Sequence, residues 1–371
     1  MIVVNNKYKC CGCSACVQRC PKQCITLHSD EEGFLYPMVN MDTCIDCGFC
    51  EKVCPVLYQA EERLPLEVFA AKNPNEEIRM ESSSGGIFTQ LAEQIIDTGG
   101  VVFGVKWNEH FEAVHAYTDT KEGLAVFRGS KYVQSQVGDT FKQTEQFLKQ
   151  GHQVLYSGTP CQIAALKLFL RKDYENLLAV DVVCHGVPSP QIWKEYMTSL
   201  KLDNIAQISH KDKTTGWREY SFSIKNVEDK VIYTQKASAN KYLSAFVKNL
   251  TLRPSCFSCP SKAGKSLSDI TLADYWGVES LLPQMDDNKG VSLLCVNTTK
   301  GKNMINQLDL ILEATNFEKS IPYNSCIVKS TSEPQGRRIF WKDYCVKGIR
   351  ALPMVKREHI LRRIIKRFLR R

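Results

Sequence analysis

Short apolar runs alternate with amphipathic segments between residues 68 and 200 of the chain. The apolar runs have the length of buried strands, and the segments between them repeat apolar residues at helical spacing. The pattern predicts strands at 68–73, 101–105, 154–157 and 177–184 and helices at 87–97, 137–149, 160–170 and 190–200. Strands that alternate with helices predict an α/β fold whose sheet is largely parallel over this stretch.

Two segments depart from this alternation. Residues 208–235 hold two runs of alternating apolar and polar residues around polar turns, which predicts an antiparallel hairpin. Residues 58–67, YQAEERLPLE, are polar and acidic, as is typical of a linker. We therefore expect an α/β chain, α+β when all parts are counted, with a small domain at 1–58, a linker at 59–67, a larger domain with a partly parallel mixed sheet at 68–345 and a tail at 346–371.

The end of the tail has the pattern of a basic amphipathic helix. Residues 356–371 carry eight Lys and Arg and one Glu, and their apolar residues form one helical stripe. Such a helix can lie on an anionic membrane surface, dock to an acidic partner or fold back onto the protein. We favour the membrane surface. Nucleic acid fits less well, because the apolar stripe would have no use there and the rest of the chain lacks a basic face.

The composition is that of a soluble globular protein, with 43% hydrophobic and 24% charged residues in 371. No apolar run has the length needed to cross a bilayer, and the apolar segment in MIVVNNKYKCC is too short for a signal peptide. We therefore expect a cytoplasmic protein, with peripheral attachment of the tail to the inner face of the cell membrane as an additional hypothesis.

Cysteine is over-represented, with 17 residues in the chain and ten of them between residues 10 and 54. The cytosol keeps thiols reduced, so a disulfide framework is disfavoured in a chain that is not exported. Metal or cluster binding is the better interpretation of this cysteine content.

Residues 10–21, CCGCSACVQRCP, and 44–55, CIDCGFCEKVCP, each fit the bacterial ferredoxin run C-x2-C-x2-C-x3-C-P. In that run the fourth cysteine serves the other cluster, which predicts one 4Fe-4S cluster at Cys10, Cys13, Cys16 and Cys54 and a second at Cys44, Cys47, Cys50 and Cys20. Cys11 and Cys24 fall outside the pattern. Zinc knuckles are the weaker alternative, since they use two cysteines from each loop. Residues 1–58 resemble a two-cluster bacterial ferredoxin.

Two loops of the larger domain lead directly into predicted helices. In ESSSGGIFTQLAEQII, residues 81–96, small residues before a helix can form an anion site for a pyrophosphate or serve as an ordinary helix cap. In SGTPCQ, Cys161 lies in the first turn, where the helix dipole favours a thiolate. That thiolate suits either a nucleophile or a cluster ligand, whereas a buried packing role fits this position less well.

Three more cysteines extend this second site. Cys184 closes a buried strand in front of His185, and Cys256 and Cys259 form a C-x2-C pair. Together with Cys161 they supply four thiolates, enough for a third 4Fe-4S cluster or for a zinc ion. We interpret His185 as structural. The remaining isolated cysteines are expected to be packed thiols: Cys295, Cys326 and Cys345.

Five motifs resemble the beta-subunit family of coenzyme F-420 hydrogenases and dehydrogenases over residues 68–280: SSSGG, RGSKYVQS, SGTPCQ, CHGVPS, and R-P-x-C-x2-C followed by SDITLADYWG. The resemblance implies an α/β domain that binds FAD and one 4Fe-4S cluster. It implies cluster ligands at Cys161, Cys184, Cys256 and Cys259, and flavin contacts at Ser83, Ser84, Gly85, Gly86, Thr89, Lys131 and Ser135. Family members also occur where coenzyme F-420 is absent, including settings linked to polysaccharide biosynthesis, so the acceptor stays open.

The predicted function is that of an iron-sulfur flavoprotein oxidoreductase with three 4Fe-4S clusters and one FAD. It would pass electrons between the clusters and the flavin, which would exchange hydride with a deazaflavin or another small-molecule acceptor. Hydride transfer needs no protein acid or base, so no catalytic side chain is assigned. Two alternatives remain: an electron-transfer subunit of a larger complex without its own substrate site, and a non-redox assembly protein whose clusters are structural.

Overall fold

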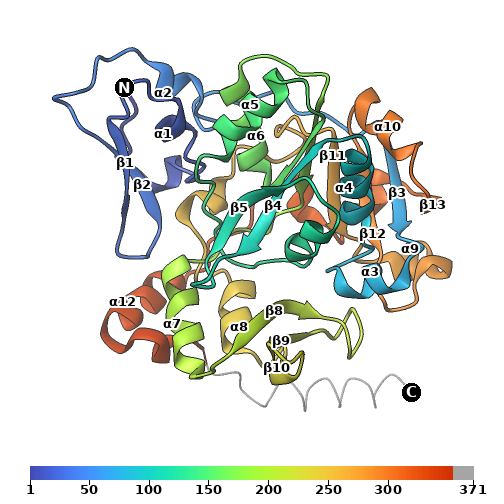
Figure 1. Ribbon diagram of the computed structural model, residues 1–371. Coiled ribbons are helices and arrows are strands. Elements are labelled where there is room, and N and C mark those ends of the chain that lie inside the picture. The colour runs from blue at the N-terminus through green and yellow to red at the C-terminus, as the bar shows by residue number, and fades with distance from the viewer. Residues whose placement is uncertain (354–371) are drawn as a thin grey trace.

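The computed structural model describes residues 1–353, and the predicted amphipathic helix at 356–371 lies outside them. An eight-stranded sheet with the order β13-β3-β12-β11-β7-β6-β4-β5 forms the centre of the molecule (Figure 1). Its strands are β3 (Glu67–Lys72), β4 (Val101–Trp107), β5 (Ala113–Thr118), β6 (Val154–Gly158), β7 (Leu177–Val182), β11 (Ile270–Asp274), β12 (Ser292–Val296) and β13 (Ile311–Ala314). The pairs β4–β6, β6–β7 and β7–β11 are parallel and the outer pairs antiparallel, which confirms the predicted partly parallel mixed sheet.

Helices cover both faces of this sheet because alternate strand residues point to opposite sides. Tyr156 packs in a core with α5 (Thr140–Lys149) and α6 (Pro160–Leu170), whereas its neighbour Leu155 packs in a core with α4 (Ile87–Asp97) and α10 (Thr299–Ile305). The helices predicted at 87–97 and 160–170 have these bounds, and α5 begins three residues later than predicted. The shorter helices of this part are α3 (Glu76–Glu81), α9 (Val278–Leu281) and α11 (Phe317–Ser320).

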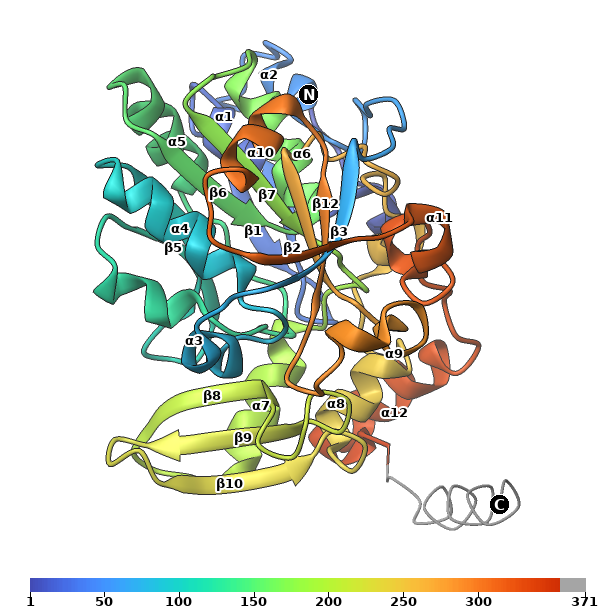
Figure 2. The ribbon, with the colours of Figure 1, turned by 90° about the vertical axis from the view of Figure 1, so that its right-hand side faces the viewer.

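A second, three-stranded antiparallel sheet lies apart from the large sheet (Figure 2). It consists of β8 (Ile205–Asp212), β9 (Ser221–Asn226) and β10 (Val231–Lys236), and it shares an aromatic-rich core with α7 (Pro190–Leu200), α8 (Lys241–Val247) and α12 (Arg337–Lys347). The predicted two-stranded hairpin was therefore incomplete. The first strand, β8, ends in the charged residues Lys211 and Asp212, which resemble a turn in sequence although Lys211 is buried.

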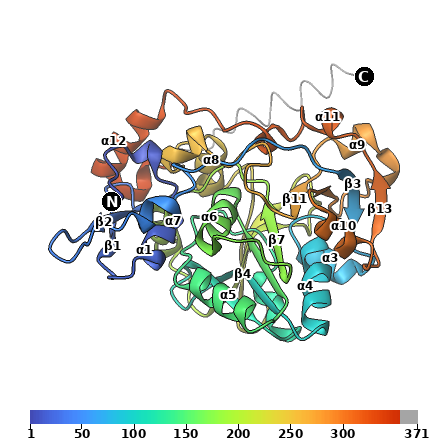
Figure 3. The same ribbon diagram turned by 90° about the horizontal axis from the view of Figure 1, so that it is seen from above.

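The N-terminal region contains the antiparallel pair β1 (Ile25–Ser29) and β2 (Leu35–Val39) and the short helices α1 (Ala15–Arg19) and α2 (Phe49–Lys52). It lies beside α6 and α12 (Figure 3). Glu32 contributes to this interface by accepting hydrogen bonds from Arg337. The ferredoxin-like region thus packs closely against the larger part of the chain.

The segment predicted as a linker is held along the surface of the larger part. The backbone N–H of Arg63 donates to Ala263 O at 3.1 Å, and that of Leu66 donates to Val296 O at 2.7 Å. These contacts lead the chain directly into β3. Within residues 1–353, no helix has the length and apolar character needed to span a membrane.

Candidate functional site

The first ferredoxin-type pocket lies between the loop before α1 and the end of α2. Its lining includes Cys10, Cys13, Cys16 and Cys54. Gly12 and Ser14 adopt positive φ values of 71° and 61°, which bend the loop around the pocket. Burial, with Cys10 and Cys54 nearby, raises the pKa of the Cys16 thiol to about 12. The cationic iron-sulfur core of a cluster would bind these thiols as thiolates and so relieve the cost of bringing them together.

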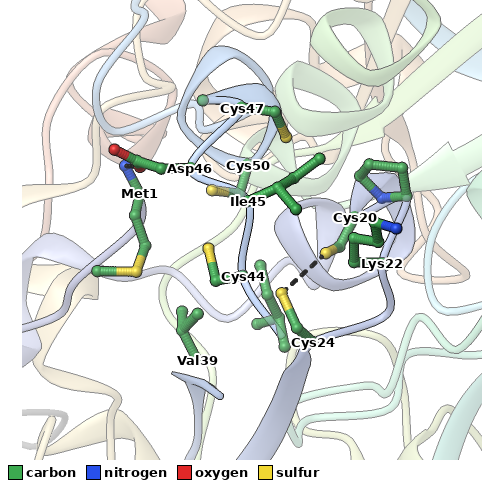
Figure 4. Close-up of a pocket in the computed structure, with 13 residues that line it drawn as sticks. Met1, Cys20, Lys22, Cys24, Val39, Cys44, Ile45, Asp46, Cys47 and Cys50 are labelled. Atoms are coloured by element: carbon green, nitrogen blue, oxygen red, sulfur yellow. Dashed lines mark hydrogen bonds and ion pairs between the residues drawn. The ribbon is translucent and has the colours of Figure 1, made fainter. Parts of the chain in front are cut away.

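The second pocket is lined by the thiols of Cys20, Cys44, Cys47 and Cys50 (Figure 4). Each pocket takes three cysteines from one run and the fourth from the other run, which is the exchange that the ferredoxin pattern predicts. Cys24 lies on the same wall, with its sulfur 3.4 Å from that of Cys20. The donor set of both pockets suits a 4Fe-4S cluster.

A third group of thiols gathers at the edge of the large sheet. Cys161 lies in the first turn of α6, Cys184 follows β7, and Cys256 and Cys259 lie at the 3-10 helix Pro254–Ser258. Burial and then the neighbouring Cys161 raise the pKa of the Cys259 thiol to about 11, and burial raises that of Cys184 to about 12. The structure thus brings together the four cysteines that the resemblance implied as ligands. Among residues 1–353, no three His, Cys, Asp or Glu side chains are arranged to hold a single metal ion.

Cys11 lies between the first and third groups. Its buried side chain packs in one core with Cys13 and Cys161. The contact with Cys11 and burial raise the pKa of the Cys161 thiol well above its ordinary value. In the sequence, Cys11 falls outside the ferredoxin ligand pattern. Its spacing gave no signal that it lies between two cysteine groups.

The other isolated cysteines differ from one another. Cys295 is buried in the sheet, whereas Cys345 is exposed, so the prediction of a packed thiol was wrong for Cys345. Cys345 follows Tyr344, which faces the core, and successive residues of a helix point in different directions. Cys326 contacts His185 Nδ1 at 3.6 Å, and His185 Nε2 donates to Asn249 Oδ1 at 2.6 Å, as suits a structural histidine.

The loop before α4 carries most of the predicted flavin contacts. The backbone N–H of Ser130 donates to Ser83 Oγ at 2.6 Å, which joins this loop to the loop that holds Lys131. Ser84 Oγ donates to Val291 O at 2.8 Å. A Cβ at Gly85 would collide with Ala71 O, so this position requires glycine.

The backbone N–H groups at the start of α4 have no side-chain cap and could bind an anion. Gly86 is its N-cap, with φ of 81°, and no side chain caps the helix. The first N–H groups of a helix without a cap can bind phosphate oxygens. Thr89 is buried and accepts a hydrogen bond from Arg128, so its hydroxyl stabilises the loop.

Two more predicted contacts lie near this loop. Lys131 donates to the carbonyls of Arg128 and Gly129, and desolvation lowers the pKa of its ammonium to about 7. Ser135 accepts a hydrogen bond from Gln162 at 3.0 Å and therefore lies next to the helix that contains Cys161. The predicted flavin contacts extend from the start of α4 to the third cysteine group.

Sequence reasoning missed two buried lysines beside the same loop. Lys213 donates to three backbone carbonyls, those of Arg79, Ser84 and Lys289. Lys211 pairs with Asp274 at 2.6 Å, and its ammonium lies 4.7 Å from the ring centre of Trp276. The only signal was the alternation HKDK at the end of one strand, which places both lysines on the same face.

Comparisons with known proteins match most of the chain to three family models. The model described as "Coenzyme F420 hydrogenase/dehydrogenase, beta subunit N-term" matches residues 68–142, and the corresponding C-terminal model matches residues 151–319. The model of a 4Fe-4S dicluster domain matches residues 9–57. The two parts of the beta-subunit family together cover most of the large sheet and all four cysteines of the third group.

Individual relatives match smaller parts of this chain than the family models together do. A subunit of the F(420)H(2) dehydrogenase of Methanosarcina mazei is 24% identical over 206 residues, which is 51% of this chain and 58% of the relative. A ferredoxin of Hydrogenibacillus schlegelii, described as 7Fe, is 46% identical over 43 residues, 12% of this chain and 49% of the relative. The chain therefore spans less than two thirds of the length of these relatives.

A solved structure of the F420-reducing [NiFe] hydrogenase complex from Methanosarcina barkeri contains a similar chain, with 17% identity and a TM-score of 0.47 over 72% of this chain and 93% of that one. The family assignment rests instead on the matched sequence models and on the motifs that form the sites described above. The chain belongs to the coenzyme F420 hydrogenase/dehydrogenase beta-subunit family and carries a 4Fe-4S dicluster domain at its N-terminal side.

Proposed function

We propose that this protein is an iron-sulfur flavoprotein that passes electrons between ferredoxin-type clusters and FAD. The observation that carries the proposal is that Cys11 and Cys13 pack in one core with Cys161. The first ferredoxin-type pocket therefore lies directly beside the third cysteine group. Electron transfer through a protein requires such close approach of neighbouring redox groups.

Three clusters would be held by cysteines of this chain. The ligands would be Cys10, Cys13, Cys16 and Cys54 for the first, Cys20, Cys44, Cys47 and Cys50 for the second, and Cys161, Cys184, Cys256 and Cys259 for the third. Four thiols in each set match the four-cysteine ligation of a 4Fe-4S cluster. Zinc would also accept four thiolates, but the two ferredoxin runs favour iron in this chain.

The flavin would be bound by the loop before α4. Its pyrophosphate would lie on the uncapped helix start at Gly86, with Lys131 nearby as a cation and Ser83 and Ser84 shaping the loop. Thr89 and Ser135 would fix the loop and its junction with α6. A bound flavin supplies the exchange between one-electron and two-electron steps, and hence hydride exchange with a deazaflavin or another small-molecule acceptor.

The composition of the purified protein tests this proposal. After anaerobic purification we expect about twelve iron atoms and about twelve sulfides per chain, since three 4Fe-4S clusters are proposed, together with one FAD. Iron, sulfide and flavin quantitation measure this. A protein with the expected iron but no flavin would contradict the flavoprotein proposal, and clusters that no reductant reduces would favour a structural role.

A second candidate is an electron-transfer subunit that relays electrons to a partner protein. It is favoured by the exposed thiol of Cys47 in the second pocket, which brings that site to the surface of the chain. The relative from Methanosarcina mazei is also named as a subunit. Reduction of the flavin by a small molecule without any partner would contradict this candidate. The chemical class of the small molecule that exchanges electrons with the flavin would show whether a role such as polysaccharide biosynthesis fits.

We also propose peripheral membrane attachment through residues 356–371, because the charge and apolar stripe of this segment suit an anionic surface. Each basic residue near such a surface contributes about 1 kcal/mol, so deletion of 356–371 is expected to weaken binding to anionic lipid vesicles by about tenfold or more. Vesicle sedimentation measures this. Neutral vesicles serve as the control, and unchanged binding of the shortened chain to anionic vesicles would contradict the proposal.

A further inference from the structure

A fully buried arginine, Arg253, connects the first ferredoxin-type pocket to the third cysteine group. Its side chain is 0% exposed. The Nε group donates to Cys10 O at 2.8 Å, Nη2 donates to Leu35 O at 2.9 Å, and Nη1 donates to Gln134 Oε1 at 3.0 Å. Nη2 also lies 3.6 Å from Cys10 Sγ. The guanidinium therefore reaches a proposed cluster ligand directly.

The same residue belongs to the backbone of the third group. The N–H of Cys256 donates to Arg253 O at 2.9 Å in the turn that also leads to Cys259. One residue thus contacts Cys10 through its side chain and Cys256 through its backbone. A change in its position would move both cysteine groups relative to each other.

Two aromatic rings and a glycine pack around the guanidinium of Arg253. Its carbon lies 4.2 Å from the ring centre of Tyr36 and 5.3 Å from that of Phe34. A Cβ at Gly12 would lie 2.8 Å from Nη1, so a glycine is needed for the close approach of the cysteine loop. These contacts restrict the arginine to one position and orientation.

Within residues 1–353, the hydrogen-bond acceptors of Arg253 are three neutral oxygens and the Cys10 sulfur, and none of them is a carboxylate. A buried cation is costly unless a negative group compensates it. A cluster with four thiolate ligands is negatively charged and becomes more so when it is reduced. A loaded first pocket would therefore supply the missing compensation, and the reduced cluster would supply more of it.

We propose that Arg253 is a positioning residue that raises the reduction potential of the cluster at Cys10, Cys13, Cys16 and Cys54 and aligns it with the third cluster. This inference rests on the proposed function, because it requires loaded clusters. Net charge and hydrogen bonds to ligand sulfurs are among the factors that set cluster potentials. A cation that donates to Cys10 Sγ stabilises the reduced state and so raises the potential.

The test compares the full chain with Arg253→Met and Arg253→Lys by redox titration monitored with electron paramagnetic resonance. For Arg253→Met we expect one cluster signal to shift to lower potential, so that the ratio of reduced to oxidised cluster at a fixed potential falls about tenfold, or about 59 mV for one electron. For Arg253→Lys, which keeps the charge but not the fork of donors, we expect a smaller shift in the same direction.

Arg337→Lys is the matched control, because Arg337 is also buried at this interface but pairs with Glu32 and Leu252 O rather than with a cysteine. Its cluster potentials should equal those of the unchanged protein. Unchanged potentials in an Arg253→Met protein with full iron would overturn the inference. If that variant loses iron, unchanged potentials in Arg253→Lys would overturn it.

Failure of the proposed function has a different result. It would show as about eight iron atoms and no flavin in the unchanged protein, as two 4Fe-4S clusters would give. The first cluster would still be present in that case, and the shift caused by Arg253→Met would still be measured.

Discussion

Replacement of Cys161 by alanine is expected to remove about four of twelve iron atoms per chain, since one 4Fe-4S cluster would lose a ligand. Cys161 is held by the first turn of α6, where Thr159 and Gln162 form a capping box, and α6 contains no second cysteine that could take its place. The two ferredoxin-type clusters should remain, because their ligands lie in separate pockets. Electrons from them should then no longer reach the flavin.

Two measurements check this result. Iron and sulfide quantitation gives the number of clusters, and flavin absorbance during stepwise reduction shows whether electrons reach the flavin. Cys345→Ala is the control, because Cys345 is exposed and belongs to none of the three groups. A Cys161→Ala protein that kept all its iron and the normal rate of flavin reduction would rule out the third cluster at this site.

Replacement of Lys213 by methionine is expected to weaken flavin binding about tenfold. The ammonium of Lys213 joins the Ser84 carbonyl of the loop before α4 to the carbonyls of Arg79 and Lys289, and the residue is 3% exposed. Losing three such hydrogen bonds costs about 3 kcal/mol at roughly 1 kcal/mol each. If half of this free energy is needed to hold the loop for FAD, the affinity falls about tenfold, because about 1.4 kcal/mol corresponds to that factor.

FAD content after gel filtration and the dissociation constant from flavin titration measure the effect. Lys289→Met is the matched control, since the Lys289 carbonyl accepts from Lys213 while its own side chain is partly exposed and pairs with Glu76. Iron content should be unchanged in both variants, which separates loss of the loop from loss of the whole fold. Normal FAD affinity in Lys213→Met would show that the flavin binds elsewhere.

Local periodicity was sufficient to predict the central part of the fold. Helices α4, α6 and α7 have the predicted bounds, and the strands that contain Val101, Val154 and Leu177 were predicted in place. This succeeded because most residues of β4, β6 and β7 are apolar on both sides of a covered sheet. Caps such as Thr159-Pro160 and Ser189-Pro190 also mark helix starts in the sequence itself.

The first strand of the three-stranded sheet could not be recognised in the same way. Lys211 and Lys213, in β8 and the loop that follows it, are charged, and charged residues in a short segment normally indicate a turn. Their burial becomes acceptable only where Asp274 of another strand pairs with Lys211 and three distant carbonyls surround Lys213. Such compensation depends on residues far away in the chain, which no local pattern contains.

Cysteine spacing along the chain was sufficient to predict iron-sulfur ligation in the N-terminal region. Two complete ferredoxin runs specify thiolate ligation, because the spacing of such a run decides which sulfurs one loop can direct at one cluster. Family motifs added the proposed flavin. How the sites connect depends on packing in three dimensions: Cys11 shares a core with Cys161, and Arg253 reaches Cys10 across 243 positions of sequence. Contacts between distant segments arise from packing, which brings residues together without leaving a spacing that can be read along the chain.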